Sequence, residues 1–298
     1  MEKTESQPVK YRSVSQYNQF KKCPYSYYLQ RRVRAWQKPA AWLPQGTAVH
    51  KAAEEWEKSG REMSLAEAQA IYTRSYAEEI TRYCQDTPNW DYWFRSGPYK
   101  CPEDVDRRYE KGFEQVEAYV RYYTETAPRE VIWITPDGEP AIELEFDIDL
   151  DGVKVRGFID QITMVQPVVP KPLTKSGKPS TSKKALAEYE ELVANTPLVP
   201  TPRDIKTGNK PGDAFQLATY DVAVEEQYGI KADQADYWMG RLGKPTKLFD
   251  LTEWTRERVT EEFRWLDESI KAEEFEPLPD PDKCNFCSVK NACEFSQG

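Results

Sequence analysis

Apolar and polar residues in the first third of the chain repeat with the spacing of amphipathic helices. A first helix is predicted over residues 13–34, with Ser13 or Ser15 as its N-cap. Its apolar or aromatic positions are Val14, Tyr17, Phe20, Tyr27 and Tyr28. Gly46 opens a second predicted helix, and a helical pattern runs from residue 64 to about residue 126, broken by DTPNWDYWFRSGPYKCP. The pattern predicts a helical region over residues 1–130.

Strand signals begin after this region and alternate with further helices. Strands are predicted over residues 131–134, 142–150 and 153–165, with an Asp151-Gly152 hairpin turn between the last two. A strand over 202–207, a helix over 212–228, a strand over 235–242 and a closing helix over 251–274 follow. This order predicts an α/β fold whose core, residues 131–250, is a mixed sheet flanked by helices.

A Pro-, Lys- and Ser-rich run interrupts the predicted core at about residues 166–200. Such composition predicts an exposed insertion, followed by a short helix over residues 185–194. Its lysines are Lys171, Lys175, Lys178, Lys183 and Lys184, and a second basic group is formed by Arg31, Arg32 and Arg34. Each group fits either solvated surface charge or a surface that guides a nucleic-acid strand.

Length and charge narrow the class of protein. A chain of 298 residues is long enough for one elaborated domain or two small ones. Its formal net charge of -9 argues against a protein that coats nucleic acid nonspecifically. Because the sequence contains neither a membrane-spanning apolar run nor a signal-peptide pattern, we expect a soluble protein of the cytoplasm of a bacterium or a phage host.

Asp204 and Lys206 form the chemically most informative pair. They are two positions apart on a predicted strand, so both side chains project from the same face. Asp160 lies near the end of an earlier predicted strand. Carboxylates that hold a hard divalent cation beside a fixed ammonium group suit phosphodiester hydrolysis, so these residues predict a metal-dependent nuclease site.

His50 is the only histidine in the chain. Schemes that need two histidines within one subunit, including HExxH metalloproteases, are therefore excluded. A Ser-His-Asp hydrolase is disfavoured because no GxSxG segment is present. A lone helical histidine is more often structural than a ligand, but the acids downstream favour a metal ligand.

Three cysteines lie within ten residues near the end of the chain, at Cys284, Cys287 and Cys293. This spacing supplies three of the four soft ligands of a zinc or iron-sulfur site. The remaining ligand candidates are Cys23, Cys84 and Cys101. Spacing alone does not distinguish zinc from iron.

Five segments, in order, resemble the RecB-like exonucleases of the PD-(D/E)XK nuclease superfamily, including the CRISPR-associated iron-sulfur exonucleases. The segments are SVSQYNQFKKCPYSYYL, GTAVH ending at His50, GFIDQI with Asp160, RDIKTG with Asp204, and QLATY with Gln216 and Tyr220. Each string is weak alone, and the ordered set is specific. The resemblance implies a restriction-endonuclease-like α/β core with a helical N-terminal region and an iron-sulfur clasp in residues 251–298.

The same resemblance assigns roles to individual residues. It implies that His50, Asp160, Asp204 and the carbonyl of Ile205 bind Mg²⁺ or Mn²⁺, and that Lys206 is the catalytic lysine. It implies that Gln216 and Tyr220, which lie at i and i+4 on one helix face, position the strand or the lysine. It also selects Cys23 as the fourth ligand and favours a [4Fe-4S] cluster over zinc.

We therefore expect a metal-dependent DNA exonuclease that acts on single-stranded DNA or DNA ends. The alternatives are an endonuclease or flap nuclease on the same core, and a noncatalytic DNA-end binding module that works with a recombination, helicase or CRISPR adaptation partner. The long insertion departs from the family pattern and has no assigned role beyond an arm that contacts DNA or a partner. Oligomers occur among related nucleases, so assembly is compatible with the resemblance.

Aromatic residues crowd one short stretch, at Trp90, Tyr92, Trp93, Phe94 and Tyr99. Such side chains can stack on the bases of a single strand, or they can pack into a core and anchor a loop. Both uses are equally compatible with the sequence, and Trp93 is the position at which the stacking role is most readily tested.

Overall fold

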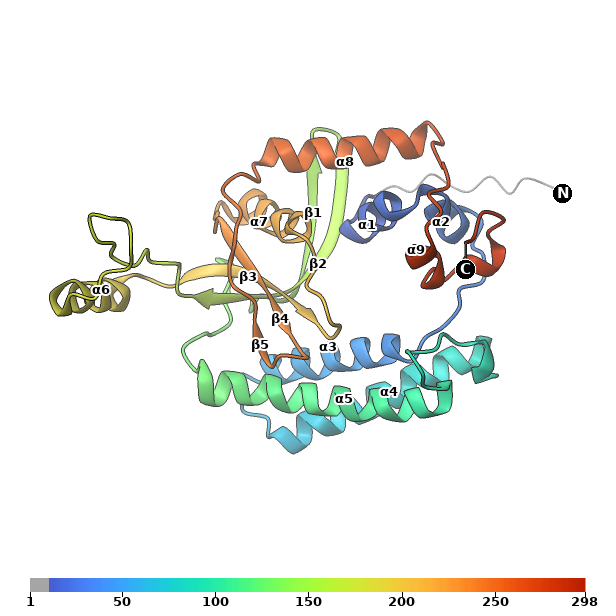
Figure 1. The fold of residues 1–298 in the computed structure, drawn as a ribbon, viewed down its shortest axis with the longest axis horizontal. Helices are drawn as coiled ribbons and strands as arrows, with labels where there is room; N and C mark the ends of the chain where they lie inside the picture. The colour runs from blue at the N-terminus through green and yellow to red at the C-terminus, as the bar shows by residue number, and fades with distance from the viewer. Residues whose placement is uncertain (1–10, 298) are drawn as a thin grey trace.

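The computed structural model describes residues 11–297 and places one twisted sheet between two layers of helices (Figure 1). The four main strands are β1 (Ile142–Leu150), β2 (Val153–Val165), β3 (Val199–Lys206) and β4 (Gln234–Met239). The short strands β5 (Lys244–Pro245) and β6 (Phe249–Asp250) both pair with β4. Strands β3 and β4 are parallel and the other pairs are antiparallel, which confirms the predicted mixed sheet.

The β1–β2 hairpin turns at the predicted position. Asp151 and Gly152 both have positive φ angles, of 53° and 92°, and Leu150 pairs with Val153 on either side of them. Two consecutive residues with positive φ match the right-handed twist of a two-residue hairpin, and glycine adopts this conformation without strain. The turn therefore fixes the register in which β1 faces β2.

One face of the sheet is covered by α7 (Ala214–Tyr228), α8 (Arg256–Lys271) and α1 (Val14–Lys22). These helices share one apolar core with β1 and β2, which we call the first core; it includes Tyr17, Phe146 and Phe263. Helix α7 has buried residues around most of its circumference because it contacts both the sheet and α8.

The opposite face carries α3 (Trp42–Lys58), α4 (Leu65–Asp86) and α5 (Cys101–Arg121). Their contacts form a second core that includes Trp56, Tyr72 and Tyr119, and the sheet contributes Ile205 and Trp238 to it. The N-terminal helices are thus divided between the two faces, and the residue-130 boundary remains a prediction.

Shorter elements connect these layers. They are α2 (Pro24–Tyr27), η1 (Tyr28–Arg32), η2 (Trp90–Tyr92), η3 (Tyr122–Thr126), α9 (Pro281–Asn285) and η4 (Lys290–Ala292). The chain end that carries α9 lies beside α2, so segments far apart in sequence are neighbours here (Figure 1). Across the described residues, the helices include none with the length and apolarity of a membrane span.

The predicted insertion forms an arm that projects from the sheet, with α6 (Lys183–Asn195) at its far end (Figure 1). It leaves from the end of β2 and returns at the start of β3, where Val165 pairs with Val199. The two ends of the arm are therefore adjacent in the sheet, and α6 buries none of its residues.

The prediction of one continuous helix over residues 13–34 was wrong. Helix α1 ends at Lys22, Cys23 is extended with φ -167° and ψ 107°, and Pro24 begins α2. Proline disfavours helical backbone in the residue before it, and this break turns Cys23 out of the helix. Helix α3 also begins four residues before Gly46, at Trp42.

Residues 131–134 do not form the predicted strand. Ile132 makes an isolated bridge with Thr163, and Ile134 makes another with Pro140. Prolines at 136 and 140 lack an amide hydrogen for a continuous ladder, so the segment bends back on itself after two contacts.

Trp93 packs into the helical layer. Its side chain is 1% exposed, and its Nε1 donates a hydrogen bond to the carbonyl of Thr87 at 2.9 Å. For Trp93 the structure therefore decides between the two uses: this side chain anchors the connection between α4 and α5 and does not present a face to a base.

Candidate active site

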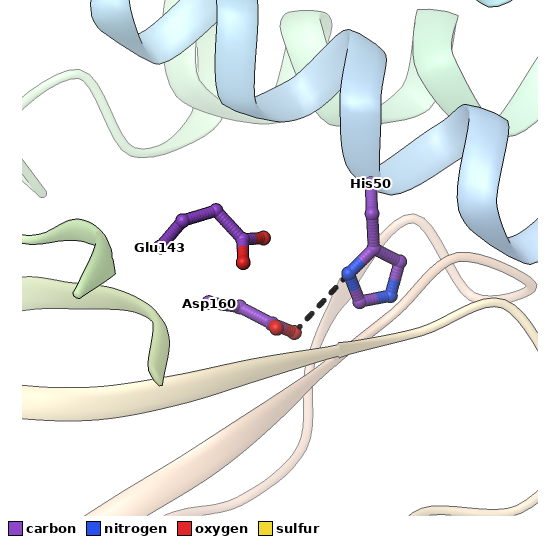
Figure 2. A group of neighbouring side chains, drawn as sticks. All are labelled: His50, Glu143 and Asp160. Atoms are coloured by element: carbon purple, nitrogen blue, oxygen red, sulfur yellow. Dashed lines mark ion pairs between the residues drawn. The ribbon is translucent and has the colours of Figure 1, made fainter. Parts of the chain in front are cut away.

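His50 and Asp160 meet between α3 and β2 (Figure 2). The Nδ1 atom of His50 is 3.4 Å from Asp160 Oδ2, and its Nε2 atom is 2.8 Å from the carbonyl oxygen of Ile205. Asp160 Oδ2 also accepts a hydrogen bond from the Ile205 amide at 2.7 Å. Three of the four candidate metal-ligand residues, His50, Asp160 and Ile205, thus lie next to one another although they come from separate elements.

Small residues in α3 permit this approach. Ala48, Val49, Ala52 and Ala53 are buried against the second core, which holds the helix close to the sheet. At Gly46, an added Cβ would lie 3.4 Å from Thr207 Oγ1, so the helix passes directly over the end of β3.

Asp204, Lys206, Gln216 and Tyr220 form a second, directly bonded group. Lys206 Nζ is 2.7 Å from Asp204 Oδ2 and donates to Gln216 Oε1 at 3.2 Å. Gln216 Nε2 donates to Asp204 Oδ1 and to Tyr220 Oη, and Tyr220 Oη donates to Asp204 Oδ1 at 3.3 Å. Gln216 and Tyr220 lie one turn apart on α7, so this helix fixes both the acid and the lysine.

Gly157 explains the glycine of the GFIDQI segment. A Cβ at this position would lie 2.7 Å from the Phe146 ring, and Phe146 in turn contacts the ring of Tyr220 in an edge-on arrangement with 6.1 Å between centroids. The absent side chain therefore makes space for a ring that supports the tyrosine behind Asp204.

Glu143 is a site residue that the sequence analysis missed. Its carboxylate joins His50 and Asp160 in a group whose ligand atoms all lie within 4.8 Å of one another (Figure 2). Glu143 has φ 48°, in the left-handed region, although it lies within β1. A non-glycine residue in this conformation is strained, and such strain often occurs at functional sites.

Like charges accumulate in this half-buried site. Burial, together with the charge of Asp160, raises the pKa of Glu143 to about 7 and that of Asp204 to about 6. Burial alone would lower the pKa of His50, but Asp160 raises it to about 9. The carboxylates therefore repel one another, and a bound cation would reduce this repulsion.

The oxygen atoms also fit a divalent cation. Asp204 Oδ2 is buried, and within residues 11–297 its one close partner is the ammonium group of Lys206 at 2.7 Å. Free carboxylate oxygens, one imidazole and a backbone carbonyl are ligands that Mg²⁺ and Mn²⁺ accept. Asp204 stands outside the tight group of His50, Glu143 and Asp160.

Arg203 supports the strand that carries Asp204. It is fully buried and forms a two-point ion pair with Asp236, with distances of 2.6 and 2.7 Å, and a further pair with Glu130 at 2.7 Å. Because Arg203 and Asp236 are register partners on parallel strands, this pair links β3 to β4 directly beneath the site.

Replacing Glu143 with glutamine is expected to raise the melting temperature of the metal-free protein and to weaken Mn²⁺ binding. The substitution keeps the shape of the side chain while it removes one of two carboxylates that repel each other, and it also removes a ligand charge. Calorimetry of unfolding and Mn²⁺ titration measure the two effects. The matched control is Glu145→Gln, two positions along β1, and equal behaviour of the two variants would contradict the assignment of Glu143.

Cys23, Cys284, Cys287 and Cys293 line one cavity of about 400 Å³ between α1, α2 and the C-terminal segment. Further contacts join the same parts of the chain: Lys38 N donates to Ser288 O at 2.7 Å, and the rings of Tyr25 and Phe295 meet edge-on. Cys84 and Cys101 lie outside this cavity and pack in the helical layer. The four cysteines singled out from the sequence are therefore neighbours.

Comparison with known families decides the class of this site. The family model described as the PD-(D/E)XK nuclease superfamily matches residues 11–169 and 200–294. The chain belongs to the PD-(D/E)XK nuclease superfamily. Membership implies a nuclease that uses divalent metal ions and takes DNA as its substrate, in agreement with the acidic site. The matched ranges leave out residues 170–199 of the nuclease, which form most of the arm.

Two phage proteins are similar to this nuclease along nearly all their length. One is "Gene 69 protein" of Mycobacterium phage D29, which is 45% identical over 290 residues, or 95% of this chain and 96% of the relative. The other is "Gene 69 protein" of Mycobacterium phage L5, which is 43% identical over 309 residues and covers 95% of each chain. Their names state no activity.

Proposed function

We propose that the nuclease is a Mg²⁺- or Mn²⁺-dependent DNA exonuclease that acts on single strands or DNA ends. The observation that carries the nuclease activity is that His50 on α3 and Asp160 on β2 meet at Ile205 of β3, between Asp204 and Lys206, which form an ion pair. The closer resemblance to RecB-like exonucleases carries the preference for ends. A divalent cation at these ligands would activate water and stabilise the charge that builds on the phosphate.

The protein's own groups position the reacting atoms. Lys206 is 29% exposed, so its ammonium group reaches substrate while Gln216 and Asp204 hold its position. Such a fixed positive charge can orient the nucleophile or neutralise a phosphate oxygen without reorganisation during the reaction. Tyr220 and Gln216 hold Asp204 in one rotamer and are positioning residues.

We also propose that the cysteine-lined cavity holds a [4Fe-4S] cluster. Four thiols that line one cavity of about 400 Å³ are the soft ligands that either zinc or an iron-sulfur cluster needs. The resemblance to the iron-sulfur exonucleases supports the cluster over zinc.

The proposed activity is tested with linear and circular single-stranded DNA labelled at the 5′ or 3′ end, in Mn²⁺, Mg²⁺ or EDTA. We expect metal-dependent loss of linear strands only, and the label that is released first gives the polarity. Cleavage of circles would show an endonuclease or flap nuclease on the same core. Binding of ends without cleavage in any metal would replace the proposal with a noncatalytic end-binding module.

The arm is expected to contribute to DNA affinity through charge. Residues 166–187 contain five lysines and no acidic residue, in a protein of net charge -9, and only Lys184 has an ion-pair partner among the described residues, Glu188 at 3.8 Å. Replacing all five lysines with glutamine should weaken DNA binding and reduce the salt dependence, by up to about 3.5 in the slope of log K against log salt for a single strand. Fluorescence anisotropy at several salt concentrations measures both quantities.

Two further variants make the test of the arm specific. Replacing Glu188, Glu190 and Glu191 with glutamine changes charge on the same helix and should strengthen binding slightly. A deletion that joins Val165 to Val199 through a short glycine-rich turn removes the arm at paired ends of the sheet. An unchanged salt slope in both the lysine variant and the deletion would show that the lysines are only solvated charge.

A further inference from the structure

A groove extends from the catalytic residues along the β1–β2 hairpin. It encloses about 610 Å³ and lies between the start of α1 and β2. Lys206, Gln216 and Tyr220 are at one end, and Arg156 and Phe158 form part of its β2 wall. A strand whose phosphate reaches Lys206 therefore has space in this groove for an adjoining nucleotide.

Phe158 lies on this wall in a position that packing does not explain. Its side chain is 52% exposed, whereas the next residue along β2, Ile159, is buried in the first core. Its register partner on β1 is Glu145, which is exposed. Within residues 11–297, Phe158 takes part in no ring pair, so its ring gains little from the hairpin.

The strand geometry directs Phe158 towards the reaction site. Residues two apart on a strand project from the same face and are separated by roughly 7 Å along it. Phe158 is two positions before Asp160, so its ring and the catalytic carboxylate share one face of β2. The next residue of this face, Arg156, is held by Asp147 and by the Tyr11 ring at 4.2 Å. The exposed ring is thus bounded by polar groups on both sides.

We propose that Phe158 stacks on the base of the nucleotide next to the scissile phosphate and thereby selects an unpaired strand. This inference rests on the proposed nuclease function. Aromatic side chains bind single strands through base stacking, which is tolerant of sequence because every base has a π-face. A base inside a duplex is covered by its neighbours on both faces, so the ring can stack only where the strand is single or its end is frayed.

The test combines a protein variant with a modified substrate. Phe158→Ala should raise KM for a linear single strand about tenfold and leave kcat nearly unchanged, since stacking of one base contributes about 1–3 kcal/mol and 1.4 kcal/mol is a factor of ten. Phe158→Trp should restore KM. The matched control is Tyr92→Ala, which removes another exposed aromatic side chain, 61% exposed, from a different part of the fold.

Abasic substrates distinguish stacking from a general effect on the site. The substrates are linear strands that each carry one abasic nucleotide, at a different position near the end in each strand. The wild-type protein should cleave one of these strands more slowly than the intact strand. Phe158→Ala should cleave that strand and the intact strand at the same rate. Equal sensitivity of both proteins, or none in either, would overturn the inference while leaving the nuclease activity established. If the protein cleaves nothing, anisotropy with intact and abasic strands in EDTA applies the same comparison to binding.

Discussion

Asp204→Ala is expected to reduce DNA cleavage by about a thousandfold or more while the protein remains folded and still binds DNA. Asp204 contributes a buried carboxylate, and its loss removes the charge that we propose binds the cation and the contact that holds Lys206. The electrostatic contribution of a bound cation amounts to several kcal/mol of transition-state stabilisation, and each 1.36 kcal/mol corresponds to about a factor of ten in rate. Cleavage of labelled linear strands in Mn²⁺, with anisotropy for binding, measures the two effects separately.

Two variants complete this experiment. Lys206→Ala should lose a similar factor, because its ammonium group and Asp204 act at the same centre. Asp147→Asn is the matched control, since this exposed acid lies on the same hairpin and pairs with Arg156. A clean preparation of Asp204→Ala that retains cleavage would remove Asp204 from the site, and loss of cleavage in Asp147→Asn would show that the effect is not specific to the predicted ligands.

Cys287→Ser is expected to lose the absorption near 400 nm of anaerobically purified protein and to lower its melting temperature by on the order of 10 °C. Cys287 lies in the cavity that also contains Cys23, and a cluster at this place would join the N-terminal helices to the last segment of the chain. Binding energy of such a group is folding energy, and for a chain of this size each kcal/mol corresponds to roughly 2–4 °C. Iron and sulfide analysis with a thermal melt measures both.

Cys84→Ser serves as the control for this substitution. Cys84 accepts a hydrogen bond from Trp90 Nε1 and lies outside the cavity, so its replacement should leave the absorption unchanged. A wild-type protein that contains zinc and no iron would replace the cluster with a zinc site. If the wild-type protein is colourless and metal-free, and Cys287→Ser is as stable as the wild type, the four cysteines are free thiols.

The sequence was sufficient to predict the mixed sheet and to place candidate site residues on common faces, because these signals are local. Asp204 and Lys206 lie on one strand, Gln216 and Tyr220 on one helix turn, and the hairpin is set by Asp151 and Gly152. Residues two apart on a strand, or four apart on a helix, lie on the same face, so periodicity alone places each of these pairs of side chains together.

Glu143 could not be predicted in this way. The β1 strand carries four acidic residues at alternate positions, Glu143, Glu145, Asp147 and Asp149, and all four have the same pattern of neighbours. Only the pairing of the strands distinguishes Glu143 from the other three, because Asp160 lies opposite it, between the register partners of Ile142 and Leu144. The left-handed φ of Glu143 has no signature in its residue type, because glutamate rarely adopts it.

The break at Cys23 and the burial of Trp93 were also beyond local patterns. A proline can begin a new helix or kink an existing one, and the choice at Pro24 depends on what Cys23 faces in the folded chain. Trp93 is buried by α4 and α5, which flank it in sequence but enclose it only after they pack.

The site lies where the two cores meet, and this position has a consequence for how the protein opens. His50 comes from the helical layer of the second core, whereas Glu143 and Asp160 come from the hairpin, whose apolar side belongs to the first core. A cation bound by all three would tie the layers together. We therefore expect Mn²⁺ to slow amide hydrogen exchange in α3 far more than in α8, so that a bound ion would also set how independently the two halves of the molecule fluctuate.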